Sequence, residues 1–301
     1  MRKIFQTQCP ASRIWWAGLC GLLLACSNSH RSSPEGYNLR KPVKRELGKD
    51  LNEISGIAFS PTLQSLLSIS DSKRKVVRID LQRQKLKNHV EKFYHQSDFE
   101  DIVLVDSLVY VLISDGTILS MPLSARDSTQ TVAYPFWSKD KNDFETLYYD
   151  PSEQALVMLC KDCAAEKGQH VRTAYRFDLA RKQFDSSAFY TISTAEVKAL
   201  LKKDDADFRP SAAAIHPLDG RLYILSSAGQ LLVVTDTRGK VLAAYPLNPD
   251  LFPQAEGLAF SPSGTMFITN EGKYGKANLL VFPYYKRPRA PKGVQKPAPS
   301  E

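Results

Sequence analysis

The stretch Ala255-Glu256-Gly257-Leu258-Ala259 is one of five related phrases along this chain of 301 residues. The other copies are Asn52–Ala58, Phe99–Val103, Phe144–Tyr148 and Pro210–Ala214. Each copy combines a small or acidic residue with a short apolar run. A phrase that recurs in this way indicates a repeat architecture in which each copy builds one structural unit.

The spacing of the copies points to one kind of repeat. A period near 45 residues is typical of a propeller blade. Aligned on the second letter, the copies fall at Glu53, Glu100, Glu145, Ser211 and Glu256, in steps of 47, 45, 66 and 45 residues.

The residues after each copy alternate short apolar runs with turn signals. In the fifth copy, Gly257–Phe260 is followed by a Pro- and Gly-containing turn, a second strand at Thr265–Thr269 and a third at Asn278–Phe282. The fourth copy adds a fourth strand at Val241–Tyr245. Four short antiparallel strands per repeat predict an all-β fold, a five-bladed β-propeller, with a six-bladed ring as the alternative.

Two segments lie outside this regular pattern. Tyr37–Leu47 precedes the first copy, and we expect it to close the ring as the outer strand of blade five. The third repeat is about 20 residues longer than the others and contains an amphipathic segment, Thr194–Lys203. Ser193 and Glu196 form a capping box at its start. We expect a short helical insertion between blades three and four that covers the rim, with a lid over the channel mouth as the alternative.

The N-terminal residues have the pattern of a signal peptide for export. Residues 1–25 have a basic start and an apolar stretch of 12 residues, Ile14–Ala25, which is too short to span a bilayer. Leu23-Leu24-Ala25-Cys26 resembles a bacterial lipobox, so we expect a lipoprotein signal peptide and lipidation at Cys26. Ser27 resembles the signal for delivery to the outer membrane, whose periplasmic face we favour over the inner membrane. Alternatively, Cys26 is an ordinary cysteine near a conventional cleavage site.

Charge is concentrated at the two ends of the chain. Loss of the three basic residues in 1–25 lowers the formal net charge from +8 to +5, and residues 286–301 hold +4 of that. The body is therefore almost neutral, which argues against a nucleic-acid partner. We expect a polar tether at 26–36, the propeller at 37–285 and a basic, Pro-rich disordered tail at 286–301. Contact of this tail with an anionic surface is an alternative.

Two cysteines lie in the body, as Cys160-Lys161-Asp162-Cys163. In an oxidising envelope the pair predicts a small-loop disulfide or two free thiols. Redox chemistry ranks second, because the motif follows a strand instead of beginning a helix. Zinc ranks last, since a zinc site needs two further ligands.

The repeated carboxylates are the main functional clue. The first strand of each blade lines the channel, so Glu53, Glu100, Glu145 and Glu256 are predicted to converge at one mouth. At about 5 Å and an effective dielectric of about 20, each pair would repel by roughly 3 kcal/mol. Such a ring must take up protons, pair with cations or bind a metal ion, and its hard oxygen ligands favour calcium or magnesium over zinc. Predicted accessory residues around the mouth are Asp71, Asp98, Asp115, Asp143, Lys161, Ser211, Asn270 and Glu271.

An alternative explains the same residues without a ligand. A polar side chain at the start of an inner strand can hydrogen-bond the backbone amides of the next blade.

The phrases also resemble those of a known family. Asn52–Ile57, Asp98–Ile102, Asp143–Leu147 and above all Phe252–Ala259, with its Pro-Gln-Ala-Glu-Gly core, are similar to the SdiA-regulated, or YjiK-like, propeller family. This resemblance implies a bacterial protein of the cell envelope. Related propellers, including calcium-binding lactonase-like and phytase-like proteins, also place Glu at the channel. Ser211 departs from the acidic pattern.

Two functions follow from these observations. We favour a monomeric, lipid-anchored binding or scaffold module that presents its loops to a protein, glycan or small molecule. The alternative is a metal-dependent hydrolase for phosphoesters or lactones, with a channel carboxylate such as Glu100 or Glu145 as base. The chain has none of the usual hydrolase motifs, such as Gly-x-Ser-x-Gly or His-Glu-x-x-His.

Overall fold

A computed structural model describes residues 32–70, 75–82, 98–125, 128–273 and 275–285, together with the backbone of residues 89–92. The signal peptide, Cys26, Asp71 and the basic tail lie outside these residues, so the predictions made for them stay predictions. No helix among the described residues is long and apolar enough to cross a membrane.

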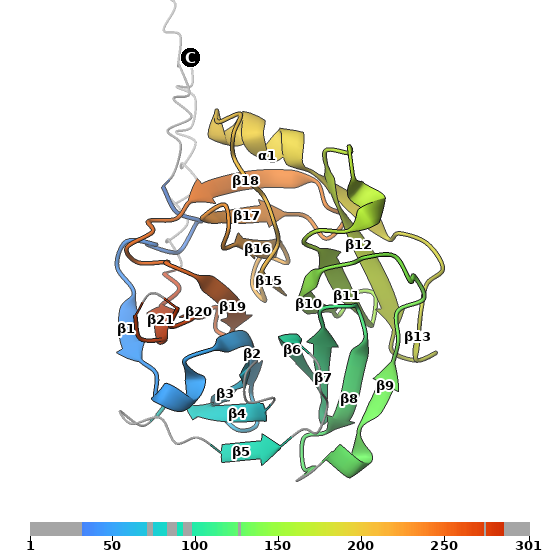
Figure 1. Ribbon diagram of the computed structural model, residues 1–301. Helices are drawn as coiled ribbons and strands as arrows, with labels where there is room; N and C mark the ends of the chain where they lie inside the picture. Colours follow the sequence, from blue (N-terminus) through green and yellow to red (C-terminus); the bar gives the residue numbers. More distant parts are fainter. Residues whose placement is uncertain are drawn as a thin grey trace, which may run out of the picture. The chain divides into compact units, whose positions relative to one another are not determined.

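Five antiparallel sheets form a ring of five blades, as the 45-residue period predicts (Figure 1). Blade 1 contains β2 (Ile54–Ser60), β3 (Ser65–Ser70), β4 (Lys75–Asp80) and β5 (His89–Lys92). Blade 2 contains β6 (Phe99–Val105), β7 (Leu108–Ile113), β8 (Ile118–Pro122) and β9 (Val132–Tyr134).

Blade 3 departs from the four-stranded pattern. Its strands are β10 (Phe144–Asp150), β11 (Ala155–Cys160) and the long β12 (Val171–Asp178), which pairs with both β13 (Gln183–Phe184) and β14 (Tyr190–Ser193). The extra length of the third repeat is therefore divided between this additional strand and a helix.

Blade 4 is regular, and blade 5 is completed from the other end of the chain. Blade 4 contains β15 (Ala212–Ile215), β16 (Leu222–Ser226), β17 (Leu231–Thr235) and β18 (Val241–Pro246). Blade 5 contains β19 (Ala255–Phe260), β20 (Met266–Asn270) and β21 (Asn278–Phe282). Its outer strand is β1 (Val43–Glu46), antiparallel to β21, which confirms the predicted closure. Short 3₁₀ turns lie at Lys49–Leu51, Ser128–Gln130 and Ala164–Glu166.

The predicted insertion is present between blades three and four. α1 (Thr194–Leu201) begins after Ser193, whose hydroxyl accepts a hydrogen bond from the Glu196 N–H at 3.2 Å. Val197 is fully buried, but Leu200, expected on the same apolar face, is 36% exposed. The helix lies against the outer strand β18, at the periphery of the ring (Figure 1), which agrees with the favoured role at the rim.

Apolar clusters between neighbouring blades hold the ring together. One cluster joins each adjacent pair, including blades 5 and 1, where Ile54 and Ile57 pack with Phe267 and Leu279. Because successive side chains of a strand point to opposite faces, each blade packs on both of its neighbours. The burial pattern therefore repeats along the inner strands, as buried, half-buried and then three buried residues.

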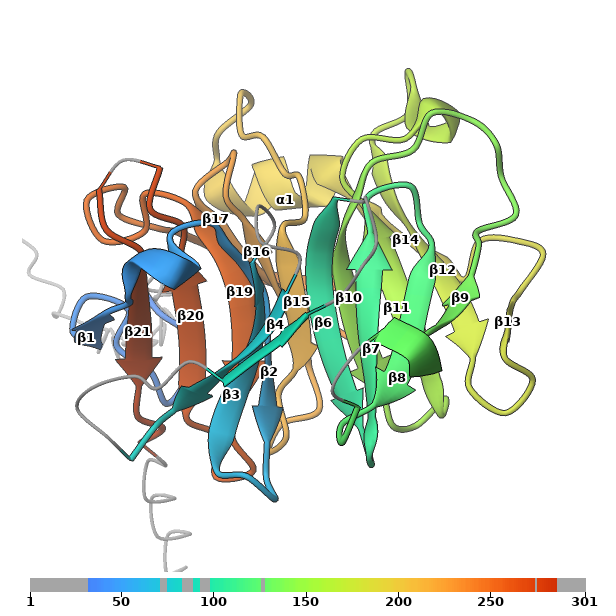
Figure 2. The same ribbon diagram turned by 60° about the horizontal axis from the view of Figure 1, so that its bottom comes forward.

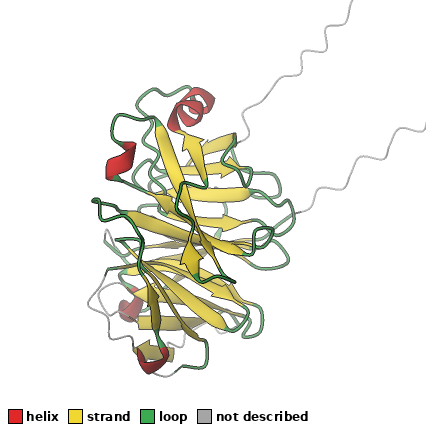
Figure 3. Cartoon of the chain, turned by 90° about the vertical axis from the view of Figure 1, so that its right-hand side faces the viewer, coloured by secondary structure: helices red, strands yellow, loops and turns green. Residues whose placement is uncertain are grey.

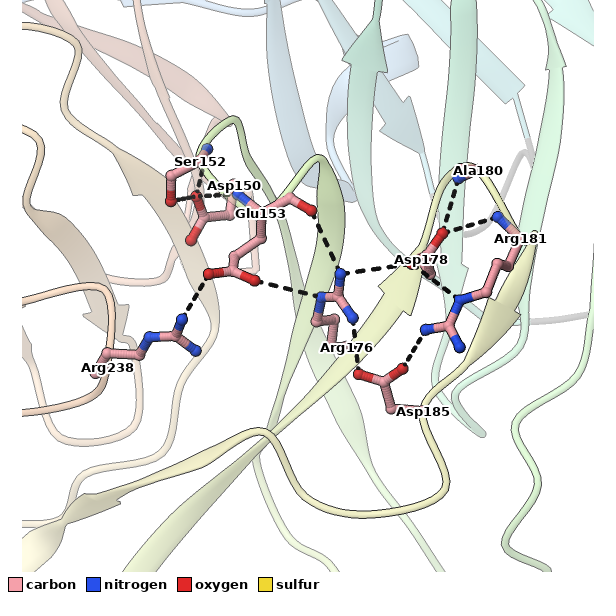
Figure 4. A network of polar contacts seen from close by, with 9 residues as sticks. All are labelled: Asp150, Ser152, Glu153, Arg176, Asp178, Ala180, Arg181, Asp185 and Arg238. Atoms are coloured by element: carbon pink, nitrogen blue, oxygen red, sulfur yellow. Dashed lines mark hydrogen bonds and ion pairs between the residues drawn. The ribbon is translucent and has the colours of Figure 1, made fainter.

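A polar network also links blades 3 and 4 (Figure 4). Arg176 on β12 lies 3.0 Å from Asp185, 3.5 Å from Asp178 and 3.7 Å from Glu153. Glu153 in turn pairs with Arg238, in the β17–β18 turn, at 2.6 Å. This single carboxylate thus connects the guanidinium groups of two blades.

The ring has two distinct faces, seen edge-on in Figures 2 and 3. We call the face at which the inner strands begin the upper face, and the face at which they end the lower face; the upper face is uppermost in Figure 2. Ser32–Gly36, assigned to the tether by the sequence, already contacts the propeller: Pro34 is buried and the Gly36 carbonyl accepts from the Tyr285 N–H at 2.9 Å.

Candidate functional site

The inner strands begin with a β-bulge that positions the repeated glutamates. In blade 2 the ladder pairs Phe99 with Ile113 and then Asp101 with Leu112, so Glu100 is the extra residue. Blades 3 and 5 show the same shift at Glu145 and Glu256. A bulge bends the strand and redirects a side chain, which explains why these carboxylates leave the ladder at the upper face.

The structure corrects the alignment of the first repeat. In blade 1 the shift lies between Ile54 and Ile57, and the burial pattern begins at Ile54. The residue equivalent to Glu100 is therefore Ser55, not Glu53. With this correction the equivalent positions are Ser55, Glu100, Glu145, Ser211 and Glu256, in steps of 45, 45, 66 and 45 residues, and all but Ser211 stand at a bulge.

Glu53 belongs to a second set of residues, two positions before the bulge. It is exposed on the surface, and its charge, together with burial, raises the pKa of Glu271, a shift that Lys273 opposes. The residues at this upstream position in the five blades are Glu53, Asp98, Asp143, Arg209 and Gln254. The prediction that four glutamates share one position is therefore wrong: Glu100, Glu145 and Glu256 stand at the bulge, and Glu53 stands two positions before it.

Two of the three bulge glutamates share one pocket at the upper face. A cavity of about 320 Å³ is lined by Glu145 from blade 3, Ser211 from blade 4 and Glu256 from blade 5. Three cations, Lys161, Arg209 and Lys273, also line it, one from each of these blades. The remaining polar side chains at the wall are Ser227 and Gln254.

Lys161 and Glu145 form the central ion pair of this pocket. The Lys161 ammonium donates a hydrogen bond to Glu145 and lies 3.8 Å from Asp143. Burial lowers the pKa of Lys161, but the bond to Glu145 and the charges of Asp143 and Glu256 outweigh burial and raise it. Burial raises the pKa of Glu145, and Lys161 opposes this shift. We take the pair as ionised, because Lys161 is surrounded by carboxylates.

Glu256 has a different protonation state. Burial and the nearby charge of Glu145 raise its pKa to about 8, against the opposing effects of Ser227, Lys161 and Gln254. At neutral pH Glu256 is therefore mostly a neutral acid that can donate a hydrogen bond. Two carboxylates with separate protonation states in one cavity are a recurring feature of functional sites.

A small disulfide presents Lys161 to the pocket. Cys160 and Cys163 are bonded, with Cα atoms 6.0 Å apart, in agreement with the first of the predicted states. Both sulfur-bearing residues are buried, and the loop between them begins where β11 reaches the upper face. The bond thus fixes the loop from which Lys161 reaches Glu145.

Capping between blades also occurs, at neighbouring positions. The Ser211 hydroxyl donates to the Ala255 carbonyl at 2.9 Å and accepts from the Ser227 N–H at 3.1 Å. Asp101, directly after Glu100, accepts from Ile102 and, across the blade boundary, from Leu147, both at 2.8 Å. The predicted bond to an amide of the next blade is thus made by Asp101, one position after the bulge, whereas Ser211 bonds a carbonyl of the next blade and an amide of its own.

Several predicted accessory residues lie outside the pocket. Asp115 is exposed and accepts a hydrogen bond from the Thr117 N–H in its own turn. Asn270 is fully buried and donates to Leu251 and Asn278, so it supports blade 5. Asp98 and Asp143 lie near Glu145, where their charges act on its pKa. Glu271 is held by the Gln254 amide, and Asp71 lies outside the described residues.

The corrected register identifies pocket residues that the phrase alone missed. Arg209 and Gln254 occupy the upstream position of blades 4 and 5, and Ser227 directly follows a second strand, as Lys161 does in blade 3. A comparison of equivalent offsets in all five repeats would have found them.

The carboxylates do not assemble a metal site among the described residues. No group of three or more His, Cys, Asp or Glu side chains in that part of the chain has the arrangement needed to hold a metal ion. Lys161 is bonded to Glu145, and its charge also acts on Glu256. A calcium ion at this mouth would have to displace Lys161 from Glu145, because calcium needs oxygen ligands.

The sequence model of the SdiA-regulated family matches residues 32–274. The chain belongs to the SdiA-regulated family. No curated protein matches it significantly. This family assignment confirms the resemblance carried by the four phrases quoted for it.

Three solved structures of similar fold are distant in sequence. A glucose dehydrogenase has 12% identity and a TM-score of 0.53, over 80% of this chain and 99% of that one. The PQQ-bound aldose sugar dehydrogenase of Streptomyces coelicolor has 13% identity and a TM-score of 0.50, over 81% and 98%. A luciferin-regenerating enzyme has 14% and 0.50, over 81% and 95%. At these identities the likeness concerns the fold alone.

Proposed function

We propose that this SdiA-regulated propeller is a lipid-anchored binding module of the bacterial cell envelope, most simply at the periplasmic face of the outer membrane. Cys26 would carry the lipid, because its sequence context resembles a lipobox. The upper pocket would take a small polar ligand that carries a carboxylate or phosphate group.

The charge of the pocket wall supports the choice of an anionic ligand. Lys161, Arg209 and Lys273 place three positive groups at the wall, where the other ionisable groups are the carboxyls of Glu145 and Glu256. Glu145 pairs with Lys161, Arg209 also pairs with Asp207 at 3.0 Å, and the pKa of Glu256 is raised to about 8. The cavity of about 320 Å³ lies at the lower end of the usual range for small-molecule sites. Glu256, as a neutral acid, can donate a hydrogen bond to the same anionic group.

A thermal-shift panel tests this function. Small carboxylates and phosphate esters are expected to raise the melting temperature, and neutral sugars of equal size are not. Lys273→Met and Arg209→Met should each weaken the shift, because each removes one cation from the wall. An equal shift with neutral sugars would contradict an anionic ligand.

The metal-dependent hydrolase stays the second candidate, and calcium stays a prediction. It is favoured by two carboxyls with different surroundings in one cavity, Glu145 bonded to Lys161 and Glu256 with a pKa raised to about 8, since acid–base chemistry needs an acid and a base. Calcium should then raise the melting temperature, and Glu100→Gln with Glu145→Gln should abolish that effect. Without a response to any divalent ion, and without turnover of p-nitrophenyl phosphates or lactones, this candidate is rejected.

A further inference from the structure

The lower face carries a second pocket, on the opposite side of the ring from the charged one. A cavity of about 300 Å³ opens there and is lined by the inner strands of all five blades. At the fourth position after each of the five equivalent positions stands a large apolar side chain, half-buried at the cavity. These five residues are Phe59, Leu104, Tyr149, Ile215 and Phe260.

This cavity is apolar, whereas the pocket at the upper face is charged. No charged side chain lines it, and its polar side-chain groups are the tyrosine hydroxyls and the Ser261 hydroxyl, which already bonds Ser263 at 2.9 Å. Pro61, Pro217 and Pro262 continue the apolar wall outward. Contact between this wall and hydrocarbon is favourable because it removes apolar surface from water, and the wall offers no partner to an ionic ligand.

Both ends of the described chain lie on this same face. The Tyr37 hydroxyl donates to the Gly264 carbonyl in the β19–β20 turn, which belongs to the lower face. The Tyr285 N–H donates to the Gly36 carbonyl, so the two ends lie side by side. Cys26 precedes Ser32 by six residues, a span of at most about 21 Å.

The residues that follow and surround these ends suit a bilayer surface. The sequence after Tyr285 contains Lys286, Arg287, Arg289, Lys292 and Lys296, charges that complement anionic lipid headgroups. Tyr285 itself is 67% exposed, and Leu218, in the turn after β15, is 52% exposed. Apolar side chains beside basic ones are typical of surfaces that lie at a membrane interface.

We propose that the lower face lies against the membrane and that its axial pocket receives an acyl chain of a bilayer lipid. This inference rests in part on the proposed anchor at Cys26, which would hold that face within reach of the bilayer. It goes beyond the anchor, because the pocket adds a second, non-covalent contact. The charged upper pocket is then directed away from the membrane.

Fluorescence quenching by brominated lipids tests the proposal on the full chain. Trp15→Phe and Trp16→Phe remove the other tryptophans, Tyr149→Trp places a reporter at the pocket, and Trp137 serves as an internal control. Trp137 is 50% exposed in the loop that leads to the upper start of β10. In phosphatidylcholine–phosphatidylglycerol vesicles with bromine on the acyl chains, the reporter is expected to lose emission and Trp137 is not.

A pocket-filling variant and a matched control complete the test. Ala214→Leu narrows the cavity and should restore the emission of the reporter, whereas Ala133→Leu, on the exposed outer strand β9, should not. Equal quenching in both variants, or none in either, overturns the proposal. Quenching only by free dibromostearic acid in unlabelled vesicles also overturns it, because the ligand would then not come from the bilayer.

One further variant separates this proposal from the anchor. Cys26→Ser should release the protein from the membrane fraction if Cys26 carries the lipid. Because the pocket contact alone could retain Cys26→Ser, the double variant Cys26→Ser with Ala214→Leu decides: its retention would reject both the anchor and the pocket contact, and its release after retention of Cys26→Ser would support the pocket contact.

Discussion

The carboxylate of Asp101 in blade 2 accepts the backbone N–H of Leu147 in blade 3 at 2.8 Å. Its other oxygen accepts the Ile102 N–H at the same distance. Burial raises the pKa of this carboxyl well above its usual value, and the two N–H bonds oppose the shift. The side chain therefore joins two blades in a place where water does not reach.

Asp101→Asn should destabilise the protein, because an amide offers a single acceptor oxygen and leaves one buried N–H unpaired. We expect a loss of about 2 kcal/mol in the free energy of unfolding, measured by urea denaturation. Asp106→Asn is the matched control: Asp106 is exposed, with a φ of 53° that Asn tolerates. An equal loss in both variants would contradict the role given to Asp101.

Gly56→Ala should disturb the same junction from the other side. A Cβ at Gly56 would collide with the carboxylate and backbone of Asp101, which lies in the neighbouring blade. We expect a loss of about 1–3 kcal/mol, whereas Gly275→Ala, with open space around it, should have little effect. Since the two residues are in contact, Gly56→Ala and Asp101→Asn should combine non-additively in a double-mutant cycle.

Glu256→Gln should change how stability depends on pH. A folded-state pKa of about 8 lies above the unfolded value of 4.5, so the folded protein binds the proton more tightly and loses stability as the pH rises between these values. The Gln variant lacks this loss. Its stability relative to wild type should rise by about 4 kcal/mol from about pH 5 to about pH 9 in urea unfolding. A difference that is constant with pH would refute the raised pKa.

Arg176 and Arg238 should differ in their effect on stability, although both pair with Glu153. The Arg176 side chain is 18% exposed and pairs with three carboxylates, so Arg176→Met leaves partly buried charges unpaired and should lower stability by about 2 kcal/mol. Arg238 is 58% exposed, and Arg238→Met should lower stability by less than about 1 kcal/mol. Thermal or urea unfolding of both variants measures the difference.

Reduction of the Cys160–Cys163 bond should lower stability by about 2 kcal/mol, the value expected for closing so short a loop. Urea unfolding with and without a reductant measures this, and the double variant Cys160→Ser with Cys163→Ser should not respond to it. Two free thiols in the unreduced protein would contradict the bond. Because the loop carries Lys161, reduction should also weaken ligand binding at the upper pocket.

The fold followed from the sequence because blade periodicity is carried by many residues at once. The closure by Tyr37–Leu47 was predictable, since blade 5 offered only three strands of its own. When the phrases are aligned on their glutamates, Glu53 is paired with Glu100. In the structure, buried Ile54 is the equivalent of buried Phe99, so this pairing is wrong. The register of a strand is set by which of its apolar side chains are buried, and the position of an acidic residue does not set it.

The candidate site was harder to predict, because its charge depends on which blades contribute acidic and which contribute basic side chains. Blade 4 replaces the Asp-x-Glu of blades 2 and 3 with Arg209-Pro210-Ser211, and this change converts one side of the mouth from acidic to basic. The position of Lys161 depends on the disulfide loop, whose geometry no spacing rule gives. The sequence did not predict the lower pocket, because each of its five large side chains, taken alone, resembles any apolar residue of a β-strand.

The pairing of β1 with β21 has a consequence for how the chain is made. Glu46 lies opposite Asn278, so the ring stays open until nearly the whole polypeptide has left the ribosome. Until then blade 5 lacks its outer strand and exposes an unpaired edge. A contact between residues so far apart in sequence also forms slowly. A nascent chain of this design stays open throughout its synthesis, and a truncated one cannot close at all.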